Sequence, residues 1–347
     1  MLKTLGAQIK EFKKDSFLTP VFMILEVLME TIIPLMMASI IDNGVEAGDI
    51  HHIYVMGGCM VIVACISLFA GTMGGKYGAR ASAGFARNLR KAMYENIQTF
   101  SFSNIDKFST AGLVTRLTTD VTNLQNAYQM LLRMCVRAPI SLICAMIMAF
   151  FINARLASVY LIAVIVLGMI LAIITVRAHH YFMEVFPKYD DLNASVQENV
   201  SAIRVVKAYV REDYEKKKFT QASKNIYNMF VKAEGVLAFN SPVMQIAVYS
   251  CIIALSWLGA KMIVAGSLTT GELMSLLTYC MNIMMSLMML SMVFVMLAMS
   301  IASAERICEV LNEKSDITNP ENPVYEVADG SVTFDHVTFR YNKTSDK

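Results

Sequence analysis

The chain has 347 residues, of which 56% are hydrophobic, and its mean hydropathy is positive at +0.50. This composition is too apolar and too evenly spread for an ordinary soluble domain, so it predicts a polytopic membrane protein. The net charge of +2 is small, and the placement of charge is more informative than its sum. We expect the lipid bilayer, and no nucleic acid, as a partner.

Six apolar segments are long enough, or nearly long enough, to cross a hydrocarbon core of about 30 Å. They are residues 17–41, 54–75, 138–153, 156–176, 240–264 and 273–301. The first follows four lysines and has no small-residue cleavage site, so we expect an uncleaved span and not a signal peptide. The third is short, and Arg133 and Arg137 at its start are expected to extend toward the membrane surface.

The connections between these segments alternate in charge. The first connection carries Asp42, Glu46 and Asp49 and has no lysine or arginine. Arg155 and Lys261 are the only basic residues in the two other connections on that side. By the positive-inside rule, the opposite side and both chain termini are therefore predicted to be cytoplasmic.

A polar stretch, residues 88–125, separates the second and third apolar segments. No proline lies between Pro34 and Pro139, so nothing forces a helix to end at the membrane surface. About 25 further residues, at about 1.5 Å each, place the turn of this stretch about 40 Å below the bilayer. The polar residues after Val176 predict a second arm of similar length, so we expect two turns at one depth.

The composition changes after the sixth segment. Pro320, Pro323 and several polar residues indicate a linker over 311–328. In 329–347, apolar residues alternate from Val332 and then, on the other parity, from Val337, which predicts a strand with a bulge or bend. We therefore expect a membrane domain over residues 1–310, a linker over 311–328 and the truncated start of a soluble domain over 329–347.

Three ordered segments carry a resemblance to a known family. They are FSTAGLVTRLTTDV at 108–121, QENV with IRVVKAYVRE at 197–200 and 203–212, and VTF with VTFRY at 332–334 and 337–341. With these segments the chain resembles the transmembrane half of an ABC exporter of the six-helix, domain-swapped type, over essentially its whole length. The resemblance implies an all-α membrane domain of six helices with long cytoplasmic extensions, followed by a short β segment that begins an α/β nucleotide-binding domain.

The resemblance also implies a function. Such a half-transporter exports hydrophobic or amphipathic substrates, namely drugs, lipids or peptides, from the cytoplasm by ATP-driven alternating access across a bacterial cell membrane. It must pair with a second half-transporter to enclose the pathway. The short N-terminus and the segment IIDNG at 40–44 resemble bacterial members that pair with a different half. A heterodimer is therefore expected first, with a homodimer as the alternative.

In this family two coupling helices dock into nucleotide-binding domains, the second into the domain of the partner. The corresponding residues are Ile105, Asp106, Lys107 and Phe108 in the first turn, and Arg204, Lys207, Tyr209, Arg211 and Glu212 in the second. The alternative interpretation is a solvated hairpin tip. Tyr341 corresponds to the aromatic residue that stacks on adenine, and its alternative role is to cover the core of the domain.

The motifs that bind and hydrolyse ATP are absent from the 347 residues. The chain has no G-x-x-x-x-G-K-[ST] loop and no signature or Walker B segment. ATP and Mg²⁺ are thus expected only through the missing nucleotide-binding domain, and we assign no catalytic residue or metal ligand. The alternative function is a truncated, non-catalytic membrane interaction subunit or pseudo-transporter. An ion-coupled secondary transporter is disfavoured. The substrate site of such a transporter is commonly built from broken helices near the middle of the membrane, whereas long cytoplasmic arms are predicted for this chain.

Two groups of residues are candidates for a substrate pathway. Glu26 and Glu30 share one face of the first span. A carboxylate inside the hydrocarbon core is costly, so it usually faces a cavity or a partner. They either line the pathway and favour cationic or polar substrate groups, or they have a structural role across the bundle. The sixth span has a methionine stripe, which is either core or a permissive wall of the cavity. The stripe is Met281, Met284, Met285, Met288 and Met292.

Overall fold

The computed structural model describes residues 1–338 except 316, 318, 320, 324, 327 and 328. Side chains are described for the same residues apart from 179, 182, 183, 186, 187, 190, 191, 294, 295, 298 and 299. The elements are α1 (Leu2–Gly6), η1 (Ala7–Phe12), α2 (Lys13–Ser39), η2 (Ile40–Glu46), α3 (Ile50–Ile97), α4 (Phe102–Phe108), α5 (Thr110–Thr115), η3 (Arg116–Asp120), α6 (Val121–Ile152), α7 (Ala154–Ser201), α8 (Ile203–Ala208), α9 (Glu212–Ala238), α10 (Asn240–Val264) and α11 (Thr270–Asn312).

Six stretches of the described chain are long and apolar enough to cross a membrane, which confirms the predicted all-α membrane architecture. They are Leu2–Glu46, Ile50–Ile97, Thr110–Ile152, Ala154–Ala178, Glu212–Val264 and Thr270–Val293. Helices α3 and α7 have 48 residues each, which corresponds to about 72 Å. A hydrocarbon core of about 30 Å leaves about 40 Å of each helix outside it.

The connections at the end of the bundle opposite α4 and α8 are short. Local residues explain where the helices that follow these connections start. Gly48 and Gly266 adopt φ angles of +69° and +73°, which residues with a Cβ rarely adopt. Asn153 caps α7, because its side-chain oxygen accepts hydrogen bonds from the backbone N–H groups of Arg155 and Leu156, both at 3.1 Å. Thr269 and Glu272 form a capping box at the start of α11.

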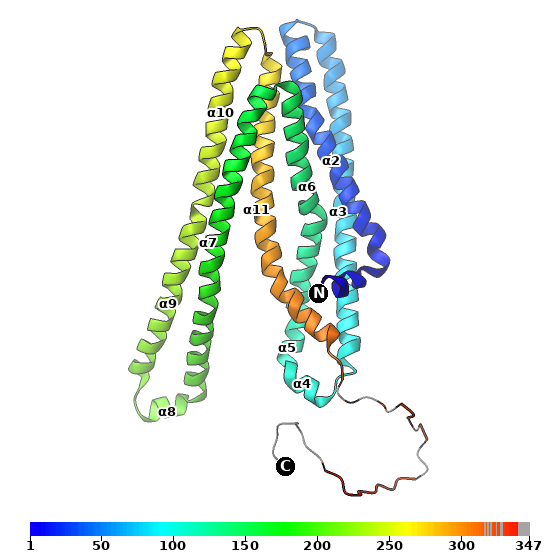
Figure 1. Cartoon of the computed structure of the whole chain (residues 1–347), viewed down its shortest axis with the longest axis vertical. Helices are drawn as coiled ribbons and strands as arrows, with labels where there is room; N and C mark the ends of the chain where they lie inside the picture. Colours follow the sequence, from blue (N-terminus) through cyan, green and yellow to red (C-terminus); the bar gives the residue numbers. More distant parts are fainter. Residues whose placement is uncertain (316, 318, 320, 324, 327–328, 339–347) are drawn as a thin grey trace.

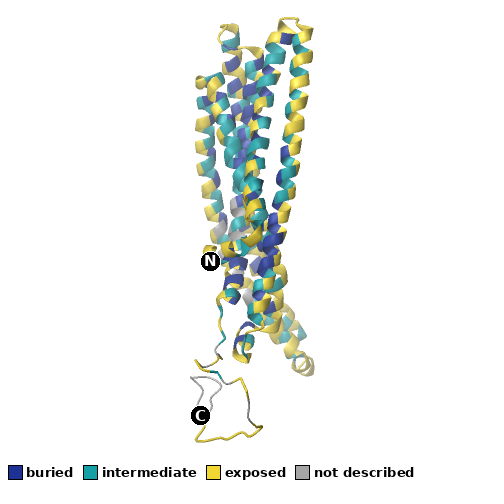
Figure 2. Ribbon diagram, turned by 90° about the vertical axis from the view of Figure 1, so that its right-hand side faces the viewer, coloured by how far each residue is buried: buried dark blue, intermediate teal, exposed yellow. Residues whose placement is uncertain are grey.

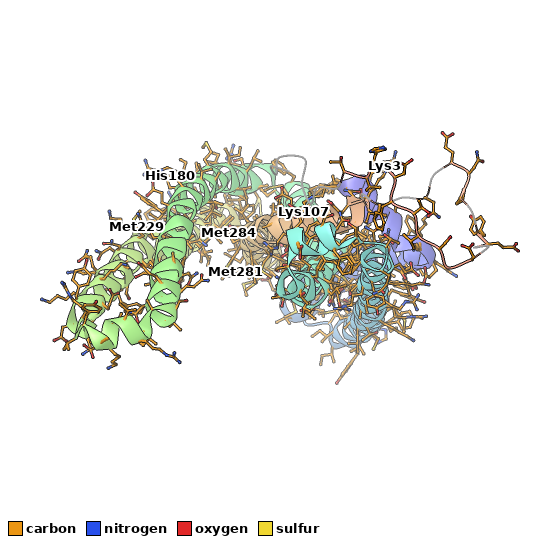
Figure 3. All side chains as sticks on the ribbon, turned by 90° about the horizontal axis from the view of Figure 1, so that it is seen from below. Lys3, Lys107, His180, Met229, Met281 and Met284 are labelled. Carbon is orange, nitrogen blue, oxygen red and sulfur yellow. The ribbon has the colours of Figure 1, made fainter. Side chains whose placement is uncertain are left out.

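The helices form two long arms (Figure 1). The first arm consists of α3, α4, α5, η3 and α6, and the second consists of α7, α8 and α9. Helix α11 packs along α6 and also contacts α2, α7 and α10. Seen from below, Lys107 lies on the larger group of helices, whereas the hairpin of the second arm is set apart (Figure 3). The tips of both arms lie at the same end of the molecule (Figure 1).

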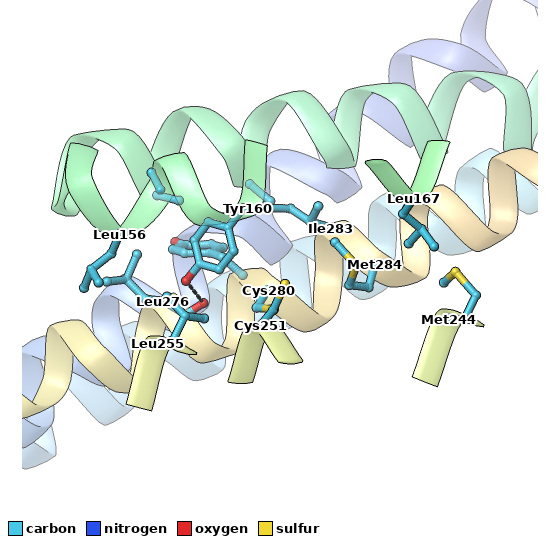
Figure 4. Close-up of a cluster of buried hydrophobic side chains, with 14 of the residues drawn as sticks. Leu156, Tyr160, Leu167, Met244, Cys251, Leu255, Leu276, Cys280, Ile283 and Met284 are labelled. Atoms are coloured by element: carbon cyan, nitrogen blue, oxygen red, sulfur yellow. Dashed lines mark hydrogen bonds between the residues drawn. The ribbon is translucent and has the colours of Figure 1, made fainter. Parts of the chain in front are cut away.

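Two apolar clusters hold the bundle together, with exposed residues along the outer faces of the helices (Figure 2). The membrane cluster joins α6, α7, α10 and α11 around the buried Tyr160, whose hydroxyl donates to the backbone oxygen of Leu276 at 2.8 Å (Figure 4). The arm cluster joins α3, α4, α6 and the last turns of α11, where Ile307 and Val310 are fully buried. The end of α11 is thus a packed part of the first arm.

The C-terminal segment differs from the expectation. The described residues between 329 and 338 contain no strand, and Val332, Phe334 and Val337 are exposed. The predicted β segment is therefore not observed there. A strand needs a neighbouring strand for its backbone hydrogen bonds, and the described part of the chain supplies none. Phe339 and Tyr341 lie outside the described residues.

Candidate functional site

The first candidate site is α4, the turn at the tip of the first arm. Asn104 starts the helix, because its Oδ1 accepts hydrogen bonds from the backbone N–H of Ser101 at 3.2 Å and from its hydroxyl at 2.7 Å. Ser109 ends the helix with a φ of 55°, and its hydroxyl accepts a hydrogen bond from Gly112 N–H to start α5. Local caps therefore fix a sharp reversal of the chain.

The residues predicted for the first turn divide into an inner and an outer set. Phe108 is buried in the arm cluster and stacks on Phe100 with ring centroids 5.8 Å apart. The guanidinium of Arg116 lies 4.7 Å from the Phe108 ring centroid, on the other side of the turn. Ile105 is half-buried and Asp106 is exposed. The turn is thus held to the arm by the buried ring of Phe108, and the polar side chain of Asp106 is exposed.

Helix α11 ends against this turn. The ammonium of Lys107 pairs with Glu313 at 2.8 Å, and Arg116 pairs with Glu309 at 2.9 Å. The side-chain amide of Asn104 donates to Glu313 Oε1 at 2.9 Å and to the backbone oxygen of Lys314 at 3.2 Å. These contacts join the tip of the first arm to the point where the chain leaves the membrane domain.

Along the first arm, further from its tip than α4, Asp120 joins η3 to α11. Its carboxylate is almost completely buried and accepts hydrogen bonds from Ser303 at 2.9 Å and from Arg306 Nε at 2.8 Å. A second nitrogen of Arg306 also donates to this carboxylate, so the pair is bidentate. The first arm and α11 are therefore joined by an ion pair as well as by apolar contacts.

The second candidate site is α8, at the tip of the second arm, and it has no buried residue. Arg204, Lys207, Tyr209 and Arg211 are exposed, and Glu212 is half-buried. Within the turn, Lys207 pairs with Glu212 at 3.0 Å. The structure thus brings the predicted residues of the second turn together on an open surface, in contrast to the first turn.

A groove of about 370 Å³ lies beside α8, between α7 and α9. Its lining includes Val196, Val200, Ile203 and Phe219, together with polar side chains at the rim. Nearby, Lys218 donates to Glu198 at 2.7 Å, and this hydrogen bond holds the pKa of Glu198 below its ordinary value of 4.5. The tip of the second arm therefore presents apolar side chains among ionised ones.

The third candidate site is an ion cluster within the membrane part of the bundle. Arg137 on α6 donates to Glu26 Oε1 at 2.6 Å and to both carboxylate oxygens of Glu30 at 2.9 Å. The expectation that Arg137 extends to the membrane surface is therefore wrong, because two carboxylates compensate its charge inside the bundle. A Cβ at Gly71 would come within 2.9 Å of Glu26 Oε1, so this glycine lets α3 approach the cluster.

Sequence reasoning left open whether the two glutamates have a substrate or a structural role. Both are hydrogen-bonded across the bundle, which is the structural role. Glu30 remains 41% exposed, however, and Glu26 Oε2 is buried without a hydrogen-bond partner among the described residues. The cluster can therefore accept a hydrogen bond from a further donor at Glu26 Oε2.

The methionine stripe of α11 divides between two environments. Met281, Met285, Met288 and Met292 are exposed and follow one face of the helix. Met284 is 1% exposed and belongs to the membrane cluster, beside Cys280 and Ile283 (Figure 4). The packing of α11 against α7 and α10 thus places Met284 in the core and leaves the other four on an open wall.

The comparisons with known proteins show the family of the chain. The family model described as the ABC transporter transmembrane region matches residues 16–288, which is more than half of the chain. The chain belongs to this family. Its six membrane helices therefore form the membrane-embedded, multi-pass part of an ABC transporter.

Relatives of this ABC transporter region are longer proteins. The "Uncharacterized ABC transporter ATP-binding protein YfiB" of Bacillus subtilis is 31% identical over 321 residues, which are 92% of this chain and 56% of that protein. A "Fatty acid ABC transporter ATP-binding/permease protein" of Mycobacterium bovis is 25% identical over 253 residues, 73% of this chain and 40% of that protein. The "Probable multidrug resistance ABC transporter ATP-binding/permease protein YheI" of B. subtilis is 28% identical over 201 residues, 57% of this chain and 34% of that protein.

Sequence reasoning missed three residues of this ABC transporter region that the structure brings to its sites. Arg137 completes the ion cluster, Asp120 joins the first arm to α11, and Asn104 joins the two helix ends. Asp120 stands within the segment that carries the family resemblance, but its partner Arg306 is 186 residues away. No local pattern predicts such a pair.

Proposed function

We propose that the chain is the transmembrane half of an ATP-driven exporter that moves hydrophobic or amphipathic substrates out of the cytoplasm by alternating access. One observation carries the proposal. A chain of the ABC transporter transmembrane family holds two short turns, α4 and α8, at the same end of the bundle, about 40 Å beyond its apolar segments. Domains that bind and release ATP there would move both turns together.

In this proposal residues 1–310 form the membrane domain, 311–328 the linker and 329–347 the start of a nucleotide-binding domain. The relatives are named as ATP-binding proteins. The chain spans about half the length of these relatives. ATP and Mg²⁺ would bind in that further domain. Tyr341, which lies outside the described residues, would stack on the adenine ring.

A second half-transporter is the proposed partner. The open surface of α8, which has no buried residue, supports a partner at that turn. The exposed apolar side chains of α10 would contact lipid or the second half. In α10 these side chains are Ile246, Tyr249, Ile253 and Trp257. A heterodimer is favoured over a homodimer because the N-terminal segment resembles heterodimeric bacterial members. Both termini would be cytoplasmic, and the location would be a bacterial cell membrane.

The exposed methionine wall of α11 supports substrates of an apolar or amphipathic kind. Methionine side chains are flexible and polarizable, so such a wall re-packs around molecules of different shape. Two relatives bear names that refer to fatty acid and to multidrug resistance. Because Arg137 offsets much of the charge of Glu26 and Glu30, the ion cluster favours a cationic group less strongly than two free carboxylates would.

The test is transport by inside-out membrane vesicles from cells that express the native reading frame containing this chain. Vesicles should accumulate a fluorescent amphipathic cation such as ethidium when ATP is added, and not with a non-hydrolysable analogue. Co-expression with a candidate second half distinguishes the heterodimer from the homodimer. If no partner yields ATP-driven accumulation of apolar, cationic or acyl-chain probes, the exporter proposal fails, and the non-catalytic interaction subunit becomes the better interpretation.

A further inference from the structure

The buried amide of Asn104 holds two helix ends at once. Its oxygen caps the start of α4 through Ser101, and its nitrogen donates to Glu313 Oε1 and to the backbone oxygen of Lys314 at the end of α11. A carboxamide has one acceptor and one donor group, and here each group serves a different helix. The position of α4 therefore depends on the position of the end of α11.

The end of α11 is itself fixed by α3. The side-chain amide of Asn96 donates to the backbone oxygens of Val310 at 2.7 Å and Glu313 at 3.0 Å. Val310 lies in the last turn of α11, where backbone acceptors have no intrahelical partner, and Glu313 is the C-cap that directly follows it. Buried Ile307 and Val310 add apolar contact in the arm cluster. The chain after residue 313 thus starts from an anchored point beside α4.

The tip of the second arm offers a direct contrast. Helix α8 contacts α7 and has no buried residue, and the described ion pairs near it join residues of the second arm only. The first turn is thus bound to the point where the chain leaves the membrane domain, whereas the second turn has no such attachment in the described chain. The two turns cannot respond in the same way to a force on the segment after α11.

We propose that Asn104, Lys107 and Glu313, with the backbone oxygen of Lys314, form a joint that makes α4 and the end of α11 move as one unit. We call this set the α4–α11 joint. Asn104 and Glu313 act as positioning residues, because they transmit displacement of the segment after residue 313 to α4. The use of the joint in transport rests on the proposed function, whereas the mechanical link between α4 and the end of α11 does not.

The test exchanges the amide and the carboxylate. Asn104→Asp keeps the acceptor that caps α4 but places a second carboxylate against Glu313 and against the backbone oxygen of Lys314. Glu313→Gln supplies an amide at the other position. The double variant N104D/E313Q restores one hydrogen bond between an amide and a carboxylate and the original charge beside Lys107, but not the hydrogen bond to the backbone oxygen of Lys314. Asn228→Asp is the matched control, because it makes the same substitution at an exposed position of α9, outside the joint.

The first readout is hydrogen–deuterium exchange of the full-length protein in nanodiscs, followed in peptides that cover 102–108 and 307–314. Asn104→Asp should accelerate exchange about tenfold or more in both peptides, because it buries an unsatisfied acceptor pair between them. The double variant should slow exchange again in both peptides, toward the wild-type rate, because it remakes the hydrogen bond between positions 104 and 313, and Asn228→Asp should change neither peptide. Acceleration confined to one peptide, or no recovery in the double variant, would overturn the joint.

The second readout is transport per ATP hydrolysed in proteoliposomes. We expect the ratio to fall severalfold in Asn104→Asp and to recover in the double variant, while ATP hydrolysis continues. An unchanged ratio in Asn104→Asp, with both peptides exchanging faster, overturns the role in transmission. If the wild-type protein shows no ATP-driven transport at all, the proposed function fails instead, and the exchange data alone decide whether the joint exists.

Discussion

The pair of Asp120 and Arg306 allows a quantitative prediction of stability. The Asp120 side chain is 1% exposed and the Arg306 side chain is 45% exposed. Removing one member of a fully buried pair costs about 3–5 kcal/mol. In Asp120→Asn the charge left behind belongs to Arg306, which water already reaches, so the penalty for an uncompensated buried charge is small. Loss of the bidentate, charge-assisted hydrogen bonds remains, and we expect a cost of about 2 kcal/mol.

The assay is thermal unfolding of the purified protein in one detergent, with Glu95→Gln as the matched control. Glu95 pairs with Lys91 at 3.8 Å, and both side chains are more than half exposed. Loss of that pair should cost no more than about 0.5 kcal/mol. We expect Tm to fall by about 4 °C in Asp120→Asn and by less than about 1 °C in Glu95→Gln. Equal shifts in the two variants would refute the reasoning, because the buried pair would then contribute no more than an exposed one.

Three further predictions concern packing and docking. Gly271→Ala should lower Tm by several degrees, since a Cβ there meets the backbone oxygen of the facing helix at 2.5 Å, whereas Gly57→Ala has open space and should be neutral or slightly stabilising. Met284→Ala should cost about 2–5 kcal/mol in unfolding measurements, because it empties a core position, but the exposed Met288→Ala should leave stability unchanged and alter only the substrate profile in transport assays. Tyr209→Ala should leave Tm unchanged and reduce ATP-driven transport, and a loss of Tm instead would show that this exposed side chain serves the fold.

The sequence by itself determined the local features of the protein. Apolar runs of sufficient length defined six spans, and the absence of proline between Pro34 and Pro139 allowed α3 to continue to Ile97. The two turns follow from the same reasoning, because a helix rises by a fixed amount per residue. Hydropathy and helix propensity act over a few turns, so they can be read without the fold. The family resemblance likewise rests on contiguous segments.

Only the tertiary structure decided which distant residues meet. Arg137 was expected at the membrane surface, but helix packing places it against Glu26 and Glu30, more than 100 residues earlier in the chain. Met284 shares its helical stripe with Met288, yet the crossing of α7 and α10 buries one and exposes the other. The expected strand near Val332 lacks a neighbour to bond with among the described residues. Side-chain partners depend on how helices cross, which no local pattern encodes.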